Sequence, residues 1–144
     1  MKINEKELVS IAERAMEKAY SPYSDFCVGA ALLCSDGSVY EGCNIENASF
    51  TPTCCAERVA IFGAVSDGKR DFEAIAIVGG KRGASIRDFC YPCGVCRQVM
   101  SEFCGGNFKI ILSNSNGDIR VTTLDGELPH RFKLEKEEDN EKAD

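Results

Sequence analysis

The chain has 144 residues, of which 44% are hydrophobic and 28% charged, with a formal net charge of −6. This length suits one domain, and the composition is typical of a globular protein rather than a fibrous one. No apolar run reaches the roughly 18 residues that a membrane span needs, so we expect no membrane partner. Lysine and arginine form no basic stripe, which disfavours a nucleic-acid partner.

The nine cysteines are the most unusual feature of the composition. Residues 1–7 are too acidic for a signal peptide, and the sequence predicts a cytoplasmic protein. Disulfides are rare in that reducing compartment, so metal binding is the better explanation of many thiols. Four cysteines lie in or beside apolar stretches or close a helical pattern, and we expect them to be small buried side chains: Cys27, Cys34, Cys43 and Cys104.

Hydrophobic periodicity predicts three helices, over residues 5–20, 55–65 and 93–103. The first is amphipathic, with apolar positions at three- and four-residue spacing. The second has apolar residues around most of its circumference, which predicts deep burial. Gly105 and Gly106 are expected to end the third.

Five apolar segments predict strands, over residues 26–33, 39–42, 74–78, 109–113 and 119–124. We expect the first to be buried on both faces, and Gly79 and Gly80 to end the third. The alternation of helices and strands predicts an α/β fold, a three-layer α/β/α sandwich around a mixed sheet of about five strands. Residues 1–134 are expected to form one domain, followed by an acidic, disordered tail over residues 135–144.

Two short motifs bring together three thiols and a carboxylate: Cys55-Ala56-Glu57 and Pro92-Cys93-Gly94-Val95-Cys96. Structural zinc takes four protein ligands, whereas catalytic zinc takes three and keeps a water in the fourth position. Both motifs begin predicted helices, where the helix dipole favours a thiolate. The sequence therefore predicts one Zn²⁺ per chain, held by Cys55, Cys93 and Cys96. Glu57 is well placed to handle the protons of the bound water.

Three thiolates give zinc a formal charge of −1, which weakens its effect on a bound water. Arg58 is the cation nearest to Cys55 in the sequence. We hypothesise that it donates hydrogen bonds to the thiolates and so compensates their charge.

Two alternatives to a catalytic zinc site remain open. Cys54 or Cys90 could close a four-thiolate structural site, or Cys93 and Cys96 alone could form a redox pair. Against the first, Pro92 forces its predecessor into an extended conformation that carries Cys90 away from the helix. The second leaves Cys55-Ala56-Glu57 without a purpose.

These motifs, together with residues 23–32 and 42–48, resemble cytidine deaminases of the small type with three cysteine ligands, which form homotetramers. The resemblance covers residues 8–132. It implies zinc-dependent hydrolytic deamination of cytidine and 2′-deoxycytidine to uridine and 2′-deoxyuridine, with release of ammonia, in pyrimidine salvage. It also implies a five-stranded mixed sheet between helices, and active sites at subunit interfaces.

The resemblance also implies roles for single residues. Glu57 corresponds to the proton shuttle between water, ring nitrogen and departing amine. Asn44 and Glu46 correspond to residues that hold the ribose 3′-hydroxyl, Phe26 to an aromatic beside the pyrimidine, and the backbone of Ala56 to a contact with the base.

Two further aromatics correspond to positions at subunit contacts. Phe50 stands where family members often have tyrosine, near the neighbouring subunit's site. Phe132 corresponds to a residue that reaches across an interface to stack on the substrate. Two alternative functions remain: deamination of a cytosine-containing antibiotic of the blasticidin type, and a non-enzymatic zinc-binding module.

Overall fold

A computed structural model describes residues 3–136 of the chain. Its strands form one sheet in the order β2-β1-β3-β4-β5. The strands are β1 (Phe26–Cys34), β2 (Val39–Cys43), β3 (Phe72–Lys81), β4 (Lys109–Ser113) and β5 (Ile119–Thr123), and the helices are α1 (Glu5–Met16), α2 (Ala56–Ser66), α3 (Gly94–Phe103) and α4 (Leu124–Glu127). Strands β3 and β4 pair in parallel and the other neighbours pair antiparallel, so the sheet is mixed, as predicted.

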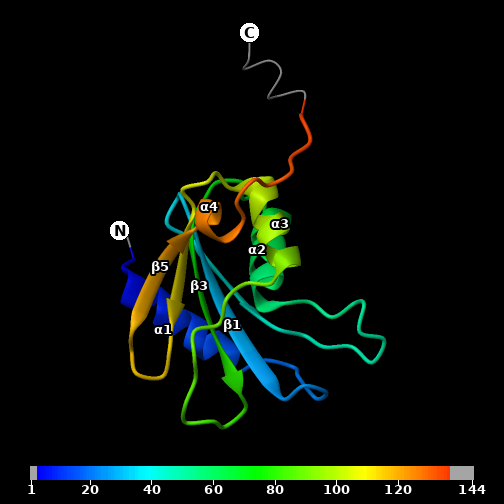
Figure 1. The fold of residues 1–144 in the computed structure, drawn as a ribbon, viewed down its shortest axis with the longest axis vertical. Helices are drawn as coiled ribbons and strands as arrows, with labels where there is room; N and C mark the ends of the chain where they lie inside the picture. The colour runs from blue at the N-terminus through cyan, green and yellow to red at the C-terminus, as the bar shows by residue number, and fades with distance from the viewer. Residues whose placement is uncertain (1–2, 137–144) are drawn as a thin grey trace.

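Helices cover both faces of this sheet, which confirms the predicted three layers (Figure 1). Successive residues of β1 alternate between the two cores. Leu32 packs in the cluster that includes α2 and α3 residues, whereas Leu33 packs in the cluster under α1. The same alternation holds for Ile77 and Val78 of β3. A strand buried on both faces has no polar side to show, which explains the continuous apolar runs in the sequence.

Helix α1 is shorter than its predicted range of residues 5–20. It begins at the Asn4 cap, whose side chain accepts from Glu7 N, and it ends at Met16. Beyond it, the chain turns so that Tyr20 N donates to Asn44 O at 2.9 Å. The pairing of Tyr20 with the segment after β2 therefore replaces the last predicted turn of helix.

Strand β3 runs through the glycine pair that was expected to end it, and this prediction is wrong. A Cβ on Gly79 would lie 2.8 Å from Cys90 Sγ and 3.2 Å from the Phe26 ring. A Cβ on Gly80 would lie 2.6 Å from Arg87 Cγ. Because the two glycines have no Cβ, side chains from other segments can pack directly on the strand backbone. The glycines therefore mark this close packing and do not end the strand.

The end of the predicted last strand folds differently. Leu124 begins the short helix α4, capped by Thr123 Oγ1, which accepts from Gly126 N. Of the four cysteines predicted to be buried, Cys27, Cys34 and Cys104 are buried and Cys43 is half-buried. Most of the predicted acidic tail lies outside the described residues. Among residues 3–136, no helix is long and apolar enough to cross a membrane.

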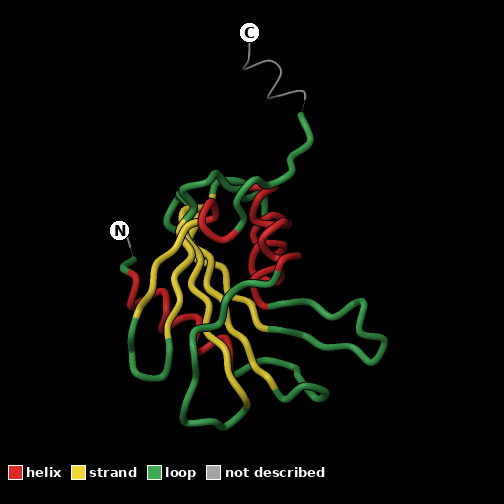
Figure 2. The backbone as a smooth tube through the Cα atoms, viewed as in Figure 1, coloured by secondary structure: helices red, strands yellow, loops and turns green. Residues whose placement is uncertain are grey.

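Helices α2 and α3 contact each other on one face of the sheet, and their N-termini open toward the same end of the molecule (Figure 1). Two long loops extend from this end, over residues 17–25 and 44–55 (Figure 2). An isolated bridge between Tyr20 and Ile45 joins the two loops, and a second one, between Ile45 and Cys54, pairs the two ends of the second loop. The second loop leads directly into α2, so the fold brings both predicted zinc motifs and the loops to one place.

Candidate active site

The three predicted zinc ligands come together at the N-termini of α2 and α3. Cys55 is the N-cap of α2 and Cys93 the N-cap of α3, while Cys96 lies in the first turn of α3. Cys55 Sγ lies 3.8 Å from Cys93 Sγ, which lies 3.5 Å from Cys96 Sγ. Tetrahedral zinc with bonds of about 2.3 Å places two sulfurs about 3.8 Å apart. The spacing of these donors therefore fits zinc.

Neither of the two other candidate thiols joins this cluster. Over residues 3–136, the sulfurs that lie within 4.8 Å of one another are those of Cys55, Cys93 and Cys96. Burial raises the pKa of the Cys54 thiol, and it raises that of Cys90 to about 12. The donor set is that of a three-ligand site.

The environment of Cys55 favours its thiolate. The hydrogen bond from Cys96, helped by one from Arg58, lowers the pKa of Cys55 to about 5 against the opposing effect of burial. Because Cys55 and Cys93 each cap a helix, the unpaired amides of two helix N-termini also surround the sulfurs. Arg58 and the two helix N-termini would therefore compensate part of the negative charge that three thiolates bring to a metal.

Arg58 lies where the sequence hypothesis requires it. Its Nη2 donates to Cys55 Sγ at 3.4 Å and to Thr53 O at 3.5 Å. Its Nε is buried without a hydrogen-bond partner among the described residues. A cation near a helix N-terminus opposes the helix dipole, so its presence there indicates a specific anionic partner. The thiolate of Cys55 is that partner.

Glu57 is a carboxylate buried inside the first turn of α2, with 4% of its surface exposed. Burial, with a further contribution from the charge of Cys55, raises the pKa of Glu57 to about 7. A carboxyl group with a pKa near the working pH can both take and return a proton. The side chain that the sequence singled out for proton transfer therefore has suitable acidity and lies beside the thiolates.

Phe26 begins β1, and its ring lies against β3 beside Cys90. Its ring packs over the bare backbone of Gly79, where Cys90 Sγ also approaches. The side chain remains 38% exposed, which leaves ring surface for a ligand. Cys90, which the sequence raised as a possible ligand, instead packs against β3 beside the Phe26 ring.

Asn44 fixes the backbone that carries Phe26. Its Nδ2 donates to Phe26 O and its Oδ1 accepts from Val28 N, each at 2.8 Å. The side chain is 9% exposed. An amide has two donor hydrogens and two acceptor lone pairs, so each atom retains capacity for one more hydrogen bond.

Glu46 is organised by the preceding loop. Its Oε1 accepts from Tyr23 N at 2.9 Å and from Ser24 N at 3.1 Å, and the Ser24 hydroxyl donates to Oε2. The hydrogen bond from the Ser24 side chain is the main cause that lowers the pKa of Glu46, which therefore stays ionised at neutral pH. Ser24 was missed by the sequence reasoning, and its place beside the Pro22 turn was the available signal.

A cavity of about 430 Å³ opens beside Glu46, lined by Tyr23, Ser24, Phe50 and Thr53. The rings of Tyr23 and Phe50 meet edge to face, with centroids 6.1 Å apart. Phe50 is 70% exposed and holds a positive φ of 62°. The loop thus presents an aromatic side chain outward.

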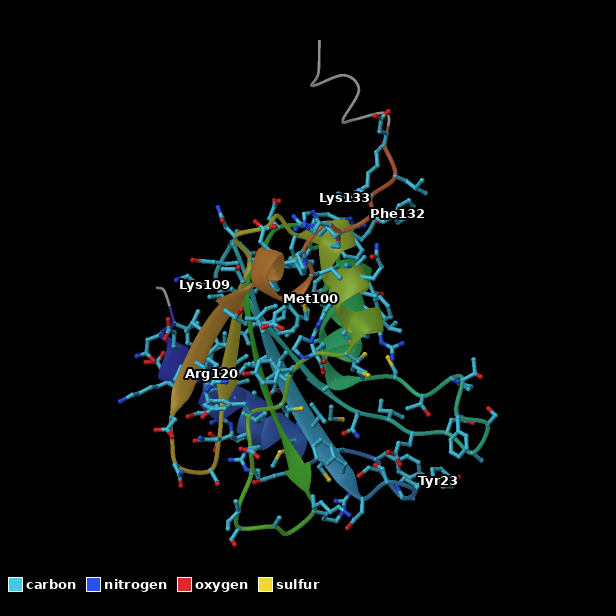
Figure 3. All side chains as sticks on the ribbon, viewed as in Figure 1. Tyr23, Met100, Lys109, Arg120, Phe132 and Lys133 are labelled. Carbon is cyan, nitrogen blue, oxygen red and sulfur yellow. The ribbon has the colours of Figure 1, made fainter. Side chains whose placement is uncertain are left out.

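The structure does not bring every predicted residue to this place. Ala56 is buried as the first residue of α2, adjacent to Cys55. Phe132 is 64% exposed and lies by the C-terminal segment, at the end of the molecule opposite Tyr23 (Figure 3). Within one chain, Phe132 is therefore separate from the loop that carries Glu46.

The cytidine and deoxycytidylate deaminase zinc-binding region matches residues 2–112. A cytidine deaminase of Sporosarcina psychrophila is 49% identical over 130 residues, covering 90% of this chain and 92% of that protein. One of Halalkalibacterium halodurans is 51% identical over 128 residues, covering 89% and 93%. A blasticidin-S deaminase of Bacillus cereus is 33% identical over 136 residues, covering 90% and 94%.

Among solved structures, a cytidine deaminase of Burkholderia pseudomallei superposes with a TM-score of 0.82 at 46% identity. The match covers 90% of this chain and all of that one. The matched range of the family model includes the three thiols and Glu57, whose geometry fits a zinc site. The chain belongs to the cytidine and deoxycytidylate deaminase family.

Proposed function

We propose that the protein is a zinc-dependent cytidine deaminase, which converts cytidine and 2′-deoxycytidine to uridine and 2′-deoxyuridine and releases ammonia. The observation that carries this conclusion is the buried Glu57 beside three convergent thiols, Cys55, Cys93 and Cys96. A structural zinc site has no use for a carboxylate there. Two relatives named cytidine deaminase, which are 49% and 51% identical to this chain, support the proposal.

Bound zinc supplies acidity to a water molecule, so that hydroxide is available at neutral pH. Glu57 would take one proton from water and pass it to the pyrimidine ring nitrogen, as the water oxygen bonds to C4 of the ring. It would then take the second proton from the new C4 hydroxyl and give it to the amine, and the C4–N bond breaks to release ammonia, so one carboxylate performs each transfer in turn. Its burial excludes bulk water from these steps. Arg58 holds the Cys55 thiolate and compensates its charge.

The nucleoside is bound by residues from the two loops and from β1. Phe26 lies against the pyrimidine, and the backbone of Ala56 contacts the base. Asn44 and Glu46 hold the ribose 3′-hydroxyl through the hydrogen-bonding capacity that their internal contacts leave free. Because deoxyribose also carries a 3′-hydroxyl, both nucleosides are substrates.

We further infer a homotetramer with active sites at subunit interfaces, formed by a single cytoplasmic domain over residues 1–134. Phe50 projects from its loop and Phe132 lies away from Glu46 in the same chain. Both aromatics are therefore free to complete a neighbouring subunit's site. Sedimentation of the protein at micromolar concentration tests the assembly.

An ultraviolet assay of the purified protein with cytidine, run beside Glu57→Gln, tests the function. We expect loss of cytidine absorbance with wild type, and at least about a 1,000-fold slower change with the variant at equal zinc content. A variant that turns over at the wild-type rate contradicts the mechanism. A wild-type chain that binds zinc but leaves cytidine unchanged supports a non-enzymatic module.

The blasticidin alternative is supported by a relative of lower identity, a blasticidin-S deaminase that is 33% identical to this chain. It is tested by offering cytidine and blasticidin S to the same preparation. We expect a higher kcat/KM with cytidine, because Asn44 and Glu46 are arranged for a sugar hydroxyl. The reverse preference would favour the antibiotic as the substrate.

A further inference from the structure

Arg97 of α3 connects two segments that are far apart in the sequence. Its Nε donates to Pro92 O at 2.8 Å, in the segment just before α3. Its Nη1 donates to Glu127 O at 2.9 Å, and its Nη2 lies 3.4 Å from Glu127 Oε2. One guanidinium therefore joins the residue before Cys93 to the end of α4.

Pro92 needs a donor that its own helix does not provide. Its side chain is fully buried, and the first hydrogen bond within α3 runs from Arg97 N to Cys93 O. The carbonyl of Pro92 lies one residue before that bond and has no intrahelical partner. A buried carbonyl requires a hydrogen bond, and Arg97 Nε supplies it. Because the peptide group is planar, this bond fixes the orientation of the Pro92–Cys93 unit and hence the approach of Cys93 Sγ.

Glu127 holds Arg97 in this position. Its side chain is only 15% exposed, and that of Arg97 29%, so the pair is partly shielded from water. A cation near the N-terminus of a helix is unfavourable unless an anion accompanies it. A second contact, from Gln98 Nε2 to Phe132 O at 3.5 Å, fixes the chain beyond α4 to the same helix. The segment after β5 thus lies against α3.

We propose that Arg97 is a positioning residue for the zinc site, and that Glu127 holds it there, so the C-terminal segment sets how firmly Cys93 retains the metal. This inference rests on the proposed function, because it requires zinc at the three thiolates. Arg97 itself contacts neither the sulfurs nor Glu57 in any hydrogen bond that the structure shows.

The test measures zinc release from the full-length, zinc-loaded protein to a chelating dye. In Arg97→Lys the charge facing Glu127 remains, but an ammonium lacks the planar fork that reaches both carbonyls. We expect zinc release about 10- to 100-fold faster than in wild type. The matched control is Arg70→Lys. Arg70 donates to Val65 O and Lys69 O at 2.8 Å, at the opposite end of α2, and its replacement should leave release unchanged.

Glu127→Gln provides the second variant. It removes the ionic contact but keeps the bond to Glu127 O, so we expect faster release than wild type and slower release than Arg97→Lys. Release at the wild-type rate in the folded variants, with melting temperatures lowered equally with and without zinc, indicates a merely structural role and overturns the proposal. Equal acceleration in Arg70→Lys also overturns it. If Arg97→Lys fails to fold, Glu127→Gln alone decides.

Failure of this inference is distinct from failure of the proposed function. A wild-type chain that binds one zinc and deaminates cytidine, with unchanged release in both variants, refutes only the role of Arg97. A wild-type chain that binds no zinc refutes both.

Discussion

Arg58 Nη2 lies 3.4 Å from Cys55 Sγ, one turn into the helix that Cys55 caps. This contact joins a cation to the thiolate whose pKa is lowered to about 5 by Cys96 and Arg58. A metal held by three thiolates has excess negative charge, and withdrawal of charge from one sulfur restores part of its acidity. Arg58 therefore influences the acidity of the metal through Cys55, the thiolate that it contacts.

Replacing Arg58 with glutamine should slow the turnover of cytidine by about 10- to 100-fold. Glutamine keeps a donor near Cys55 but removes the charge, so the bound water becomes less acidic. Steady-state kinetics and zinc content by atomic emission measure the effect. Arg70→Gln, a change at an exposed arginine at the far end of α2, is the control. Wild-type turnover and zinc content in Arg58→Gln would contradict the assigned role.

Zinc removal should expose a specific set of thiols to alkylation. With zinc bound we expect Cys55, Cys93 and Cys96 to resist iodoacetamide. After chelation, Cys55 and Cys93 should react before Cys96, because Cys55 favours its thiolate and Cys93 is the exposed member of the three. The buried Cys34 and Cys104 should stay unreactive in both states, since their pKa values are raised by burial. Mass spectrometry of digested protein locates the labelled positions.

The same experiment tests the number of ligands. If zinc also protected Cys54 or Cys90, a fourth thiolate would hold the metal and the site would be structural. We expect Cys54 and Cys90 to react with iodoacetamide equally with and without zinc. Protection of either one would contradict the deaminase mechanism.

The fold and the zinc site were predicted from the sequence for different reasons. Strands such as β4 are short apolar runs bounded by polar turns, and their predicted bounds agree with the structure. The metal motifs specify their own geometry, because two thiols three residues apart in one helical turn face the same way. Each strand and each single metal motif therefore depends on residues close together in the sequence.

The predictions that failed depended on distant contacts. Helix α1 ends early because Tyr20 pairs with the segment after β2. Gly79 continues β3 because Cys90 and Phe26 approach it from other segments. The sequence analysis did not single out Arg97, although a cation near a helix N-terminus requires an anionic partner, which is Glu127 in the structure.

Ser24→Ala should weaken nucleoside binding more than it slows the chemistry. The Ser24 hydroxyl donates to Glu46 and also accepts from Phe26 N at 3.0 Å, so it orders two proposed binding residues. We expect KM for cytidine to rise about two- to tenfold, the equivalent of one hydrogen bond, with kcat nearly unchanged. Ser38→Ala, in the β1–β2 turn where the Ser38 hydroxyl donates to Asp36 Oδ1, is the matched control. A fall in kcat at constant KM would place Ser24 in the chemical step instead.

Gly79→Ala should destabilise the protein because a methyl group cannot fit where Cys90 Sγ and the Phe26 ring meet the strand. Overpacking of this kind typically costs about 1–3 kcal/mol, measured here as the free energy of unfolding in urea. Gly63→Ala is the control. A Cβ there meets no atom within 4 Å, and alanine in a helix is favoured over glycine by about 0.5–1 kcal/mol, so stability should rise.

Cys90→Ala combined with Gly79→Ala should recover part of that loss, because removal of the sulfur makes room for the new methyl group. The coupling between the two changes, about 0.5–3 kcal/mol for residues in contact, follows from a double-mutant cycle. Additive effects would mean that Cys90 does not press on β3. Turnover should fall in Gly79→Ala alone and recover with stability in the double variant, since the same displacement moves Phe26, which we propose to bind the pyrimidine.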